Sequence, residues 1–280
     1  MIDYLNGMNK KAILTLLVLM TPVIILCQPY SGRIIISGTD NGVGFANIGI
    51  VGKNIGTVSD IDGNFTINLE DDYDSDSLRF SMIGYEAKCL LVSDFKVNPT
   101  KKIYLSPRCY NLTEVKVTFH RYKKLRLGNP VSTHDLRSGF ADNELGSELG
   151  VKIHVRKQAA LGDINLNVGI CTFDSVTYRL NIYRVTNNSL YENILTEPIY
   201  ISFSKDEIKN VIVFNLKKYS ITVEGDILVA LELYKDLGDG RLLFNTEFFT
   251  GITYHRKTSQ GKWTQSAGMI GLYLNGYIVN

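Results

Sequence analysis

Four carboxylates in the last third of the chain come nearest to a catalytic pair. They are Glu232, Asp236, Asp239 and Glu247. Two carboxyl groups placed on either side of a glycosidic bond can act as general acid and as base or nucleophile. The segment Asp236–Arg241, however, contains an Asp-Gly pair, which is typical of a tight turn. We interpret this segment as a hairpin loop and keep hydrolase chemistry as the lesser alternative.

The recognisable motifs of nucleophilic, nucleotide and metal chemistry are absent from the sequence. Gly-x-Ser-x-Gly, the Gly-x-x-x-x-Gly-Lys-Ser/Thr phosphate loop, His-Glu-x-x-His and Cys-x-x-Cys do not occur. The four His are scattered, at positions 120, 134, 154 and 255. Isolated His are more often surface or strand residues than metal ligands. The sequence therefore predicts no catalytic residue, no metal site and no cofactor, and so a protein that is not an enzyme.

Two acidic segments in the first third raise the question of calcium. Asp60 and Asp62 stand in an Asp-x-Asp-Gly sequence, as in an EF-hand, but the Glu that should close such a loop is missing. We interpret this segment as a hairpin turn in which the carboxylates bond backbone N–H groups and Gly63 takes a positive φ. For the acidic run 70–76, a solvated loop is the main interpretation, and a calcium site stays open.

Aromatic side chains are the other lead to a ligand. The chain has 16 Tyr and one Trp, and Tyr254, Trp263 and Tyr273 lie in its last third. Exposed rings can stack on sugar faces, and loops at the end of a β-sandwich often carry recognition. These three residues are therefore the candidate ligand-binding residues. The alternative is that they pack the core, since a single Trp is usually mostly buried.

Composition and charge limit the class of protein. The 280 residues are 45% hydrophobic and 21% charged, which is enough for a sizeable core and typical of two domains. Lys and Arg number 30 against 28 Asp and Glu, a formal net charge of +2. A balance so close to neutral has no electrostatic footprint for nucleic acid. We expect no nucleic-acid partner.

The first 27 residues have the layout of a secretory signal peptide. A Lys-Lys pair precedes the apolar run 12–26, and Cys27 and Gln28 follow it. The run is shorter than the roughly 20 apolar residues of a spanning helix. We expect cleavage before Gln28 and export to the periplasm, the outer membrane or the cell surface. A retained anchor and a lipidated Cys27 are the alternatives.

Export makes disulfides possible, and three cysteines remain after cleavage. Because the number is odd, at least one must be free or pair between molecules. We interpret Cys171 as a buried free cysteine. A bridge between Cys89 and Cys109 stays open, since sequence does not establish its geometry.

Alternating apolar residues predict strands along the mature chain. They mark ten segments: 34–36, 48–50, 65–69, 78–82, 151–155, 164–170, 176–182, 212–216, 227–233 and 270–274. The one predicted helical turn is at Ser204–Glu207, where Ser204 and Glu207 can form a capping box. Strands without helices between them favour β-sandwiches over a βαβ sheet.

Four sequence segments occur in order in the first region: Ser31–Ile34, Phe45–Ile50, Gly56–Phe65 and Phe80–Glu86. With this order and spacing, residues 31–107 resemble the carboxypeptidase-regulatory-like domain of exported Bacteroidetes proteins. The resemblance implies a transthyretin-like β-sandwich that serves as a stalk or fold-support module and has no catalytic role.

The segment Asn111–Val117 resembles the lead into the plug and barrel of TonB-dependent receptors. The residues that follow are too few for a 22-stranded transporter barrel, so no transmembrane barrel is expected. Residues 140–280 resemble instead the C-terminal region of Bacteroidetes proteins that carry the same first domain, through Leu145–Gly150, Leu180–Tyr183, Ile194–Ile199 and Thr258–Trp263. This second resemblance implies architecture and export but no ligand.

Together these features predict an all-β chain. The expected order is a signal peptide at 1–27, a transthyretin-like β-sandwich at 28–107, a linker at 108–139 and a second, jelly-roll-like β-sandwich at 140–280. The predicted function is that of an exported, non-catalytic binding or interaction protein of the cell envelope, with a glycan or another envelope protein as its partner. A structural or accessory subunit of an envelope complex is the alternative.

Overall fold

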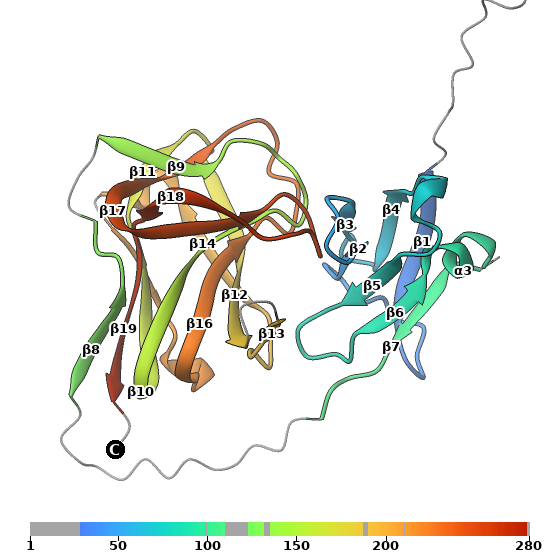
Figure 1. The fold of residues 1–280 in the computed structure, drawn as a ribbon, viewed down its shortest axis with the longest axis horizontal. Coiled ribbons are helices and arrows are strands. Elements are labelled where there is room, and N and C mark those ends of the chain that lie inside the picture. Colours follow the sequence, from blue (N-terminus) through green and yellow to red (C-terminus); the bar gives the residue numbers. More distant parts are fainter. Residues whose placement is uncertain are drawn as a thin grey trace, which may run out of the picture.

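The computed structural model describes residues 29–98, 100–109, 123–131, 135–186, 190–209 and 211–278. The expected signal peptide, the segment 111–117, His120 and His134 lie outside the described residues. Within them strands dominate, as expected, in a small N-terminal region and a large C-terminal region (Figure 1). No helix among these residues is long and apolar enough to cross a membrane.

The N-terminal region contains two small sheets. One has the strand order β4-β1-β7 and the other β3-β2-β5-β6. The bounds are β1 (Pro29–Ile36), β2 (Asn47–Ile50), β3 (Gly56–Val58), β4 (Asn64–Asn68), 3-10 helix η1 (Asp71–Tyr73), β5 (Ser77–Ser81), β6 (Lys88–Leu91), helix α3 (Val92–Val97) and β7 (Lys102–Leu105). The pairing of β1 with β7 is parallel, whereas the other strand pairs of these two sheets are antiparallel.

Both N-terminal sheets pack on one hydrophobic core. The alternating segments of the sequence supply residues of this core, among them Ile48, Ile50, Phe65, Ile67 and Phe80. Met82, at the end of the segment 78–82, is only partly buried against the core. Helix α3 was not expected; its single turn and a half is too short to show a helical period, yet it buries Val92 and Phe95.

The Asp-x-Asp-Gly segment is a turn, but not the predicted hairpin, because β3 and β4 lie in different sheets. Asp60 Oδ1 accepts hydrogen bonds from the backbone N–H groups of Asp62 (2.9 Å) and Asn64 (2.8 Å). Asp60 Oδ2 accepts a third, at 3.0 Å, from the Asn64 side chain. Gly63 has a φ of 82°, which favours glycine.

The acidic run 70–76 is held by a lysine of α3. Lys96 Nζ donates to the Glu70 carbonyl at 3.0 Å, to Asp71 Oδ1 at 2.8 Å and to Asp74 Oδ1 at 2.7 Å. The Lys96 ammonium thus supplies the positive charge for this loop, and it lowers the pKa of Asp71 through a hydrogen bond. In the part of the chain that the structure describes, no group of three or more His, Cys, Asp or Glu is arranged to hold a metal.

The C-terminal region is one large sheet with the central order β11-β17-β10-β16-β12-β13. The bounds are β8 (Lys124–Gly128), β9 (Leu136–Phe140), β10 (Glu148–Leu166), β11 (Val168–Cys171), β12 (Ser175–Thr186), β13 (Leu190–Asn193), β14 (Ile199–Ser204), 3-10 helix η2 (Lys205–Glu207), β15 (Ile212–Asn215), 3-10 helix η3 (Lys217–Tyr219), β16 (Thr222–Glu232), β17 (Leu242–Arg256), β18 (Thr264–Ile270) and β19 (Leu272–Ile278).

Two long strands, β10 and β17, change pairing partners along their length and hold this sheet together. The first part of β17 pairs with β9 and β11, and its last part pairs with β10. The first part of β10 pairs with β16 and β17, and its last part with β19 and β15. One face buries a continuous core to which β10, β12, β16, β17 and β19 all contribute. The predicted capping box forms at η2, where Ser204 and Glu207 bond reciprocally.

Two expectations about the C-terminal region need correction. The expected linker at 108–139 contains β8, and β9 begins within it; these strands pair with β19 and β17. The sequence of β8 alternates over only five residues and β9 shows little alternation, so their pairing partners decide that they are strands. The segment Asp236–Arg241 is not a hairpin loop, because β10 lies between β16 and β17.

Candidate functional site at the junction of the two regions

Four charged side chains form a row across four neighbouring strands of the C-terminal sheet. Arg256 of β17 pairs with Glu148 of β10, Glu148 with Glu232 of β16, and Glu232 with Arg179 of β12. All four residues are buried, with at most 8% of their surface exposed. The row lies on the face of the sheet opposite the hydrophobic core, because strand side chains alternate between faces and Tyr178, next to Arg179, lies in that core. We call it the charged row.

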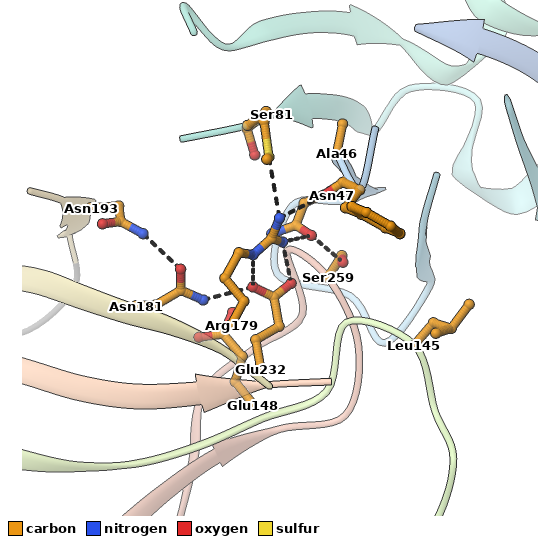
Figure 2. A network of polar contacts seen from close by, with 12 residues as sticks. Ala46, Asn47, Ser81, Leu145, Glu148, Arg179, Asn181, Asn193, Glu232 and Ser259 are labelled. Atoms are coloured by element: carbon orange, nitrogen blue, oxygen red, sulfur yellow. Dashed lines mark hydrogen bonds and ion pairs between the residues drawn. The ribbon is translucent and has the colours of Figure 1, made fainter. Parts of the chain in front are cut away.

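Arg179 and Glu232 form one half of the charged row (Figure 2). Arg179 Nε donates to Glu232 Oε2 at 2.9 Å, and Nη2 donates to Oε1 at 2.8 Å. This bidentate geometry is the strong form of an arginine–carboxylate pair. Asn181 Nδ2 donates to the same carboxylate at 2.7 Å.

The remaining donors of Arg179 reach into the N-terminal region. Nη1 donates to the Phe45 carbonyl at 2.6 Å and contacts Met82 Sδ at 3.2 Å. Nη2 donates to Asn47 Oδ1 at 2.7 Å, as Figure 2 shows. A guanidinium has five N–H donors, and each of them has a partner here. Arg179 therefore joins the two regions with a fully satisfied side chain.

The loop of the C-terminal region that contains Ser259 and Gln260 packs closely on β2 and β3. The Ser259 carbonyl lies so near Gly49 that a Cβ built there would come within 2.2 Å of its oxygen, and the same oxygen would be 2.3 Å from a Cβ at Gly56. Ser259 Oγ also donates to Asn47 Oδ1 at 3.2 Å, and the Gln260 carbonyl accepts from the Gly52 N–H at 2.9 Å. Glycine is needed at positions 49 and 56 because the two regions meet at backbone distance.

The other half of the charged row, Arg256 and Glu148, lies beside one of the aromatic residues predicted to bind a ligand, Trp263. Arg256 Nε donates to Glu148 Oε1 at 3.0 Å, and the Tyr183 hydroxyl contacts both Glu148 oxygens at 3.0 Å. The guanidinium of Arg256 lies 4.9 Å from the centre of the Trp263 ring. Trp263 in turn meets the Tyr183 ring edge-on at 6.0 Å.

The structure brings two of the three predicted aromatic residues together. Trp263 and Tyr254 pack against the same small cluster, that of Tyr183, Leu228 and Ala230, and both are half-buried. Tyr273 lies apart on β19, with its ring 5.2 Å from the Arg126 guanidinium. The guess that these three rings form a ligand site stays a prediction.

The four candidate carboxylates do not converge. Glu232 is buried in the charged row, whereas Asp236 lies on the crossing loop and accepts hydrogen bonds from Asn143 and the Gly238 N–H. Glu247 lies on β17 opposite Met269 of β18. The sequence analysis missed Arg179, Glu148 and Asn47. Their only signal is a charged or polar residue at the start of an apolar strand or within one, and this pattern does not distinguish a buried position from an exposed one.

Environment separates the two buried carboxyls. Burial raises the pKa of Glu148 to about 7, although Arg256 opposes the shift. Burial also acts on Glu232, but the charge and hydrogen bonds of Arg179 outweigh it, and the pKa of Glu232 is lowered. Glu148 is therefore the member of the charged row that changes its protonation near neutral pH.

The three cysteines among the described residues take no part in the junction. Cys89 and Cys109 are both exposed and free, so the bridge left open by the sequence is not formed. Cys171 is free, as expected, but only half-buried.

Fold and junction together define a mostly β protein in which a small region of two sheets is joined through buried polar contacts to one large antiparallel sheet. Residues 30–117 match the CarboxypepD_reg-like domain family. This part of the chain is therefore a CarboxypepD_reg-like domain, and the C-terminal region has no assigned family.

The other comparisons add little. No curated protein matches the chain. Among solved structures, the VP2 subviral particle of infectious bursal disease virus matches with 10% identity and a TM-score of 0.17. That match covers 90% of this chain and 64% of the viral chain, and such a low TM-score carries no argument.

Proposed function

We propose that this chain is an exported, non-catalytic binding protein of the cell envelope whose two domains work as one rigid unit. In this proposal the CarboxypepD_reg-like domain is a transthyretin-like β-sandwich, and the C-terminal region is a jelly-roll-like β-sandwich. The first domain supports the second and completes its surface. The partner is a glycan or another envelope protein.

The observation that carries the proposal is the bonding of Arg179. Its guanidinium is 1% exposed, and it bonds Glu232 of its own domain and Asn47 of the other in one network. Removing an ion pair from water costs several kcal/mol, and the pair's attraction offsets this cost only if its remaining hydrogen bonds are also made. Because Arg179 makes some of these bonds to each domain, both domains are needed to stabilise the Arg179–Glu232 pair. A rigid relation between domains is expected of a shared binding surface, whereas a plain spacer needs none.

The same contacts support a non-catalytic role. A general acid or base must come within hydrogen-bond reach of its substrate. The side chains of Glu148 and Glu232 are 0% exposed, and their oxygens already bond Arg256, Tyr183, Arg179 and Asn181. These two carboxyls are therefore used to hold the fold. A structural or accessory subunit remains the second candidate, since a locked pair of domains would also suit an assembly.

Retention on envelope fractions tests the binding function. The mature protein, applied to immobilised glycans and to purified envelope proteins of its own organism, should bind one of them saturably and leave it chemically unchanged, as judged by mass spectrometry. Gly49→Val forces the Ser259 loop away without removing a charge and should weaken this binding. The control is Gly162→Ala, where a Cβ would lie 3.2 Å from its nearest neighbour.

The outcomes separate the candidates. Conversion of the bound partner would refute the non-catalytic role. An absence of saturable binding to every fraction would favour the structural subunit. Equal binding by wild type and Gly49→Val, with the domains shown to be undocked by small-angle scattering, would show that the junction is not needed.

N-terminal sequencing of the exported protein should give Gln28 as the first residue.

A further inference from the structure

A polar cavity lies at the junction beside the charged row. It has a volume of about 150 Å³ and is lined by both domains. The N-terminal side contributes Arg79, Tyr85 and Arg108, and the C-terminal side contributes Asn193 and Gln260. At roughly 30 Å³ for each water molecule, it has room for a ligand of a few non-hydrogen atoms. The lining contains hydrogen-bond donors in excess of acidic groups.

Arg79 is the unusual member of this lining. It lies on β5, paired with Gly49 of β2 and Cys89 of β6. Its Nε is buried and has no hydrogen-bond partner among the described residues. A buried N–H without a partner costs free energy, and such groups normally bond water, an ion or a ligand. The structure records no acidic partner for Arg79 within the same residues, whereas the other arginines of the lining have one.

The charges around the cavity indicate that the missing partner of Arg79 is an anion. Arg179 and Arg256 are paired with Glu232 and Glu148, and Arg108 lies 3.8 Å from Glu192 at the rim of the cavity. With Glu148 and Glu232 both ionised, the guanidinium of Arg79 is left over as one uncompensated positive charge. A single anionic group would neutralise it. A guanidinium matches a carboxylate best, because its planar fork makes two parallel hydrogen bonds.

We propose that this cavity binds a small carboxylate, held by Arg79 and completed by the amides of Asn193 and Gln260. Each amide already donates one N–H, to Asn181 and Ser81 respectively, and has a second N–H for the ligand. The inference deepens the proposed function, since it makes the junction itself a binding site and names the chemical class of its ligand. The carboxylate can belong to a free hydroxy acid or to the end of a peptide chain. Both present the same group to Arg79. Because the walls come from both domains, the ligand also tightens their docking.

Thermal denaturation of the mature protein tests this site with defined probes. Lactate represents the free acid and N-acetylalanine the chain end; lactamide and N-acetylalaninamide are their neutral counterparts. At neutral pH one or both acids should raise the melting temperature saturably, and the amides should not. Arg79→Gln should weaken binding of the active acid about tenfold or more, as expected when a charge-assisted hydrogen-bond pair is lost. Arg156→Gln, an exposed arginine outside the lining, is the matched control.

The acid and amide comparison on wild type needs no variant, so it stands even if Arg79→Gln folds poorly. A response to lactate identifies a free acid as ligand, and a response to N-acetylalanine alone identifies a chain end. If neither acid acts, if the amides act equally, or if Arg79→Gln binds as well as wild type, the inference is wrong. Saturable envelope binding without any acid response would leave the proposed function in place and refute this site alone.

Discussion

The carboxylates of Glu148 and Glu232 occupy directly paired positions on β10 and β16, and both side chains are buried. Two acids at such a position would repel each other. Arg256 on one side and Arg179 on the other make the arrangement stable, since each carboxylate is bonded to a buried guanidinium. Loss of either arginine would leave its own carboxylate without a counter-charge. That carboxylate would then repel the neighbouring one, so each arginine stabilises both acids.

Arg179→Met should destabilise the protein by about 3–5 kcal/mol, since it leaves Glu232 buried without its counter-charge. Chemical denaturation monitored by tryptophan fluorescence measures the loss. The control is Arg184→Met on the same strand. The Arg184 side chain is 57% exposed and its nearest acid is 3.6 Å away, so this change should cost less than about 1 kcal/mol. Similar losses of stability for both variants would contradict this role of the Arg179–Glu232 pair.

Stability should fall between mildly acidic and mildly alkaline pH because of Glu148. Its pKa is raised from 4.5 to about 7, so the folded state binds the proton more tightly than the unfolded state. This contribution to stability is fully present below pH 4.5 and is lost as the pH rises through about 7. The carboxyl faces Arg256, Tyr183 and Glu232; the lowered pKa of Glu232 acts below this window.

Urea unfolding at about pH 5 and about pH 8 measures this effect. The wild type should lose more stability between the two values than Glu148→Gln, which keeps the shape and an acceptor oxygen but cannot ionise. Parallel losses in both proteins would show that Glu148 keeps an ordinary pKa in the folded protein.

Phe65→Ala should cost about 3–5 kcal/mol, the usual range for a truncated core phenylalanine. Phe65 is 5% exposed and its ring packs against Phe80 and Phe95 at 5.8 and 5.9 Å. Phe248→Ala is the control, because that ring is 44% exposed and should change stability by less than about 1 kcal/mol. A loss below 1 kcal/mol for Phe65→Ala would place its ring outside the core.

Trp263→Ala separates two roles of this ring. As a partner of Tyr183 and Arg256 it should lower stability by about 2 kcal/mol, the sum of one aromatic pair and one cation–π contact. Trp263→Phe keeps part of both contacts and should lose less. An unchanged melting temperature for Trp263→Ala, together with weaker envelope binding, would instead assign the ring to the ligand.

Asp60→Ala should destabilise the first domain by about 1–2 kcal/mol, because the turn loses the acceptor of two backbone N–H groups. Asp62→Ala removes a neighbouring carboxylate for which the described residues show no side-chain hydrogen bond, and it should be nearly neutral. Thermal melts of the two variants make the comparison. Equal effects would mean that charge, and not the turn geometry, matters here.

The sequence alone was sufficient for features that depend on neighbours in the chain. The turn at Asp60, the capping box of Ser204 and Glu207, and the inward side chains of Ile48 and Phe65 were all predicted. Each follows from a short-range rule: a side chain that reaches a nearby backbone group, or alternation along a strand. The resemblance of residues 31–107 to a known domain rested on the same local segments.

Only the tertiary structure decided which distant residues meet. Arg179 and Asn47 are 132 residues apart, and Ser259 and Asn47 are 212 apart, yet all three bond at the junction. The parallel partner of β1 and the place of β10 between β16 and β17 likewise depend on how strands pair over long distances. The sequence of a strand does not specify which strand pairs with it, nor whether its second face is buried. Alternation along β12 does not say what covers its polar face, and this face is a junction only because another domain lies on it.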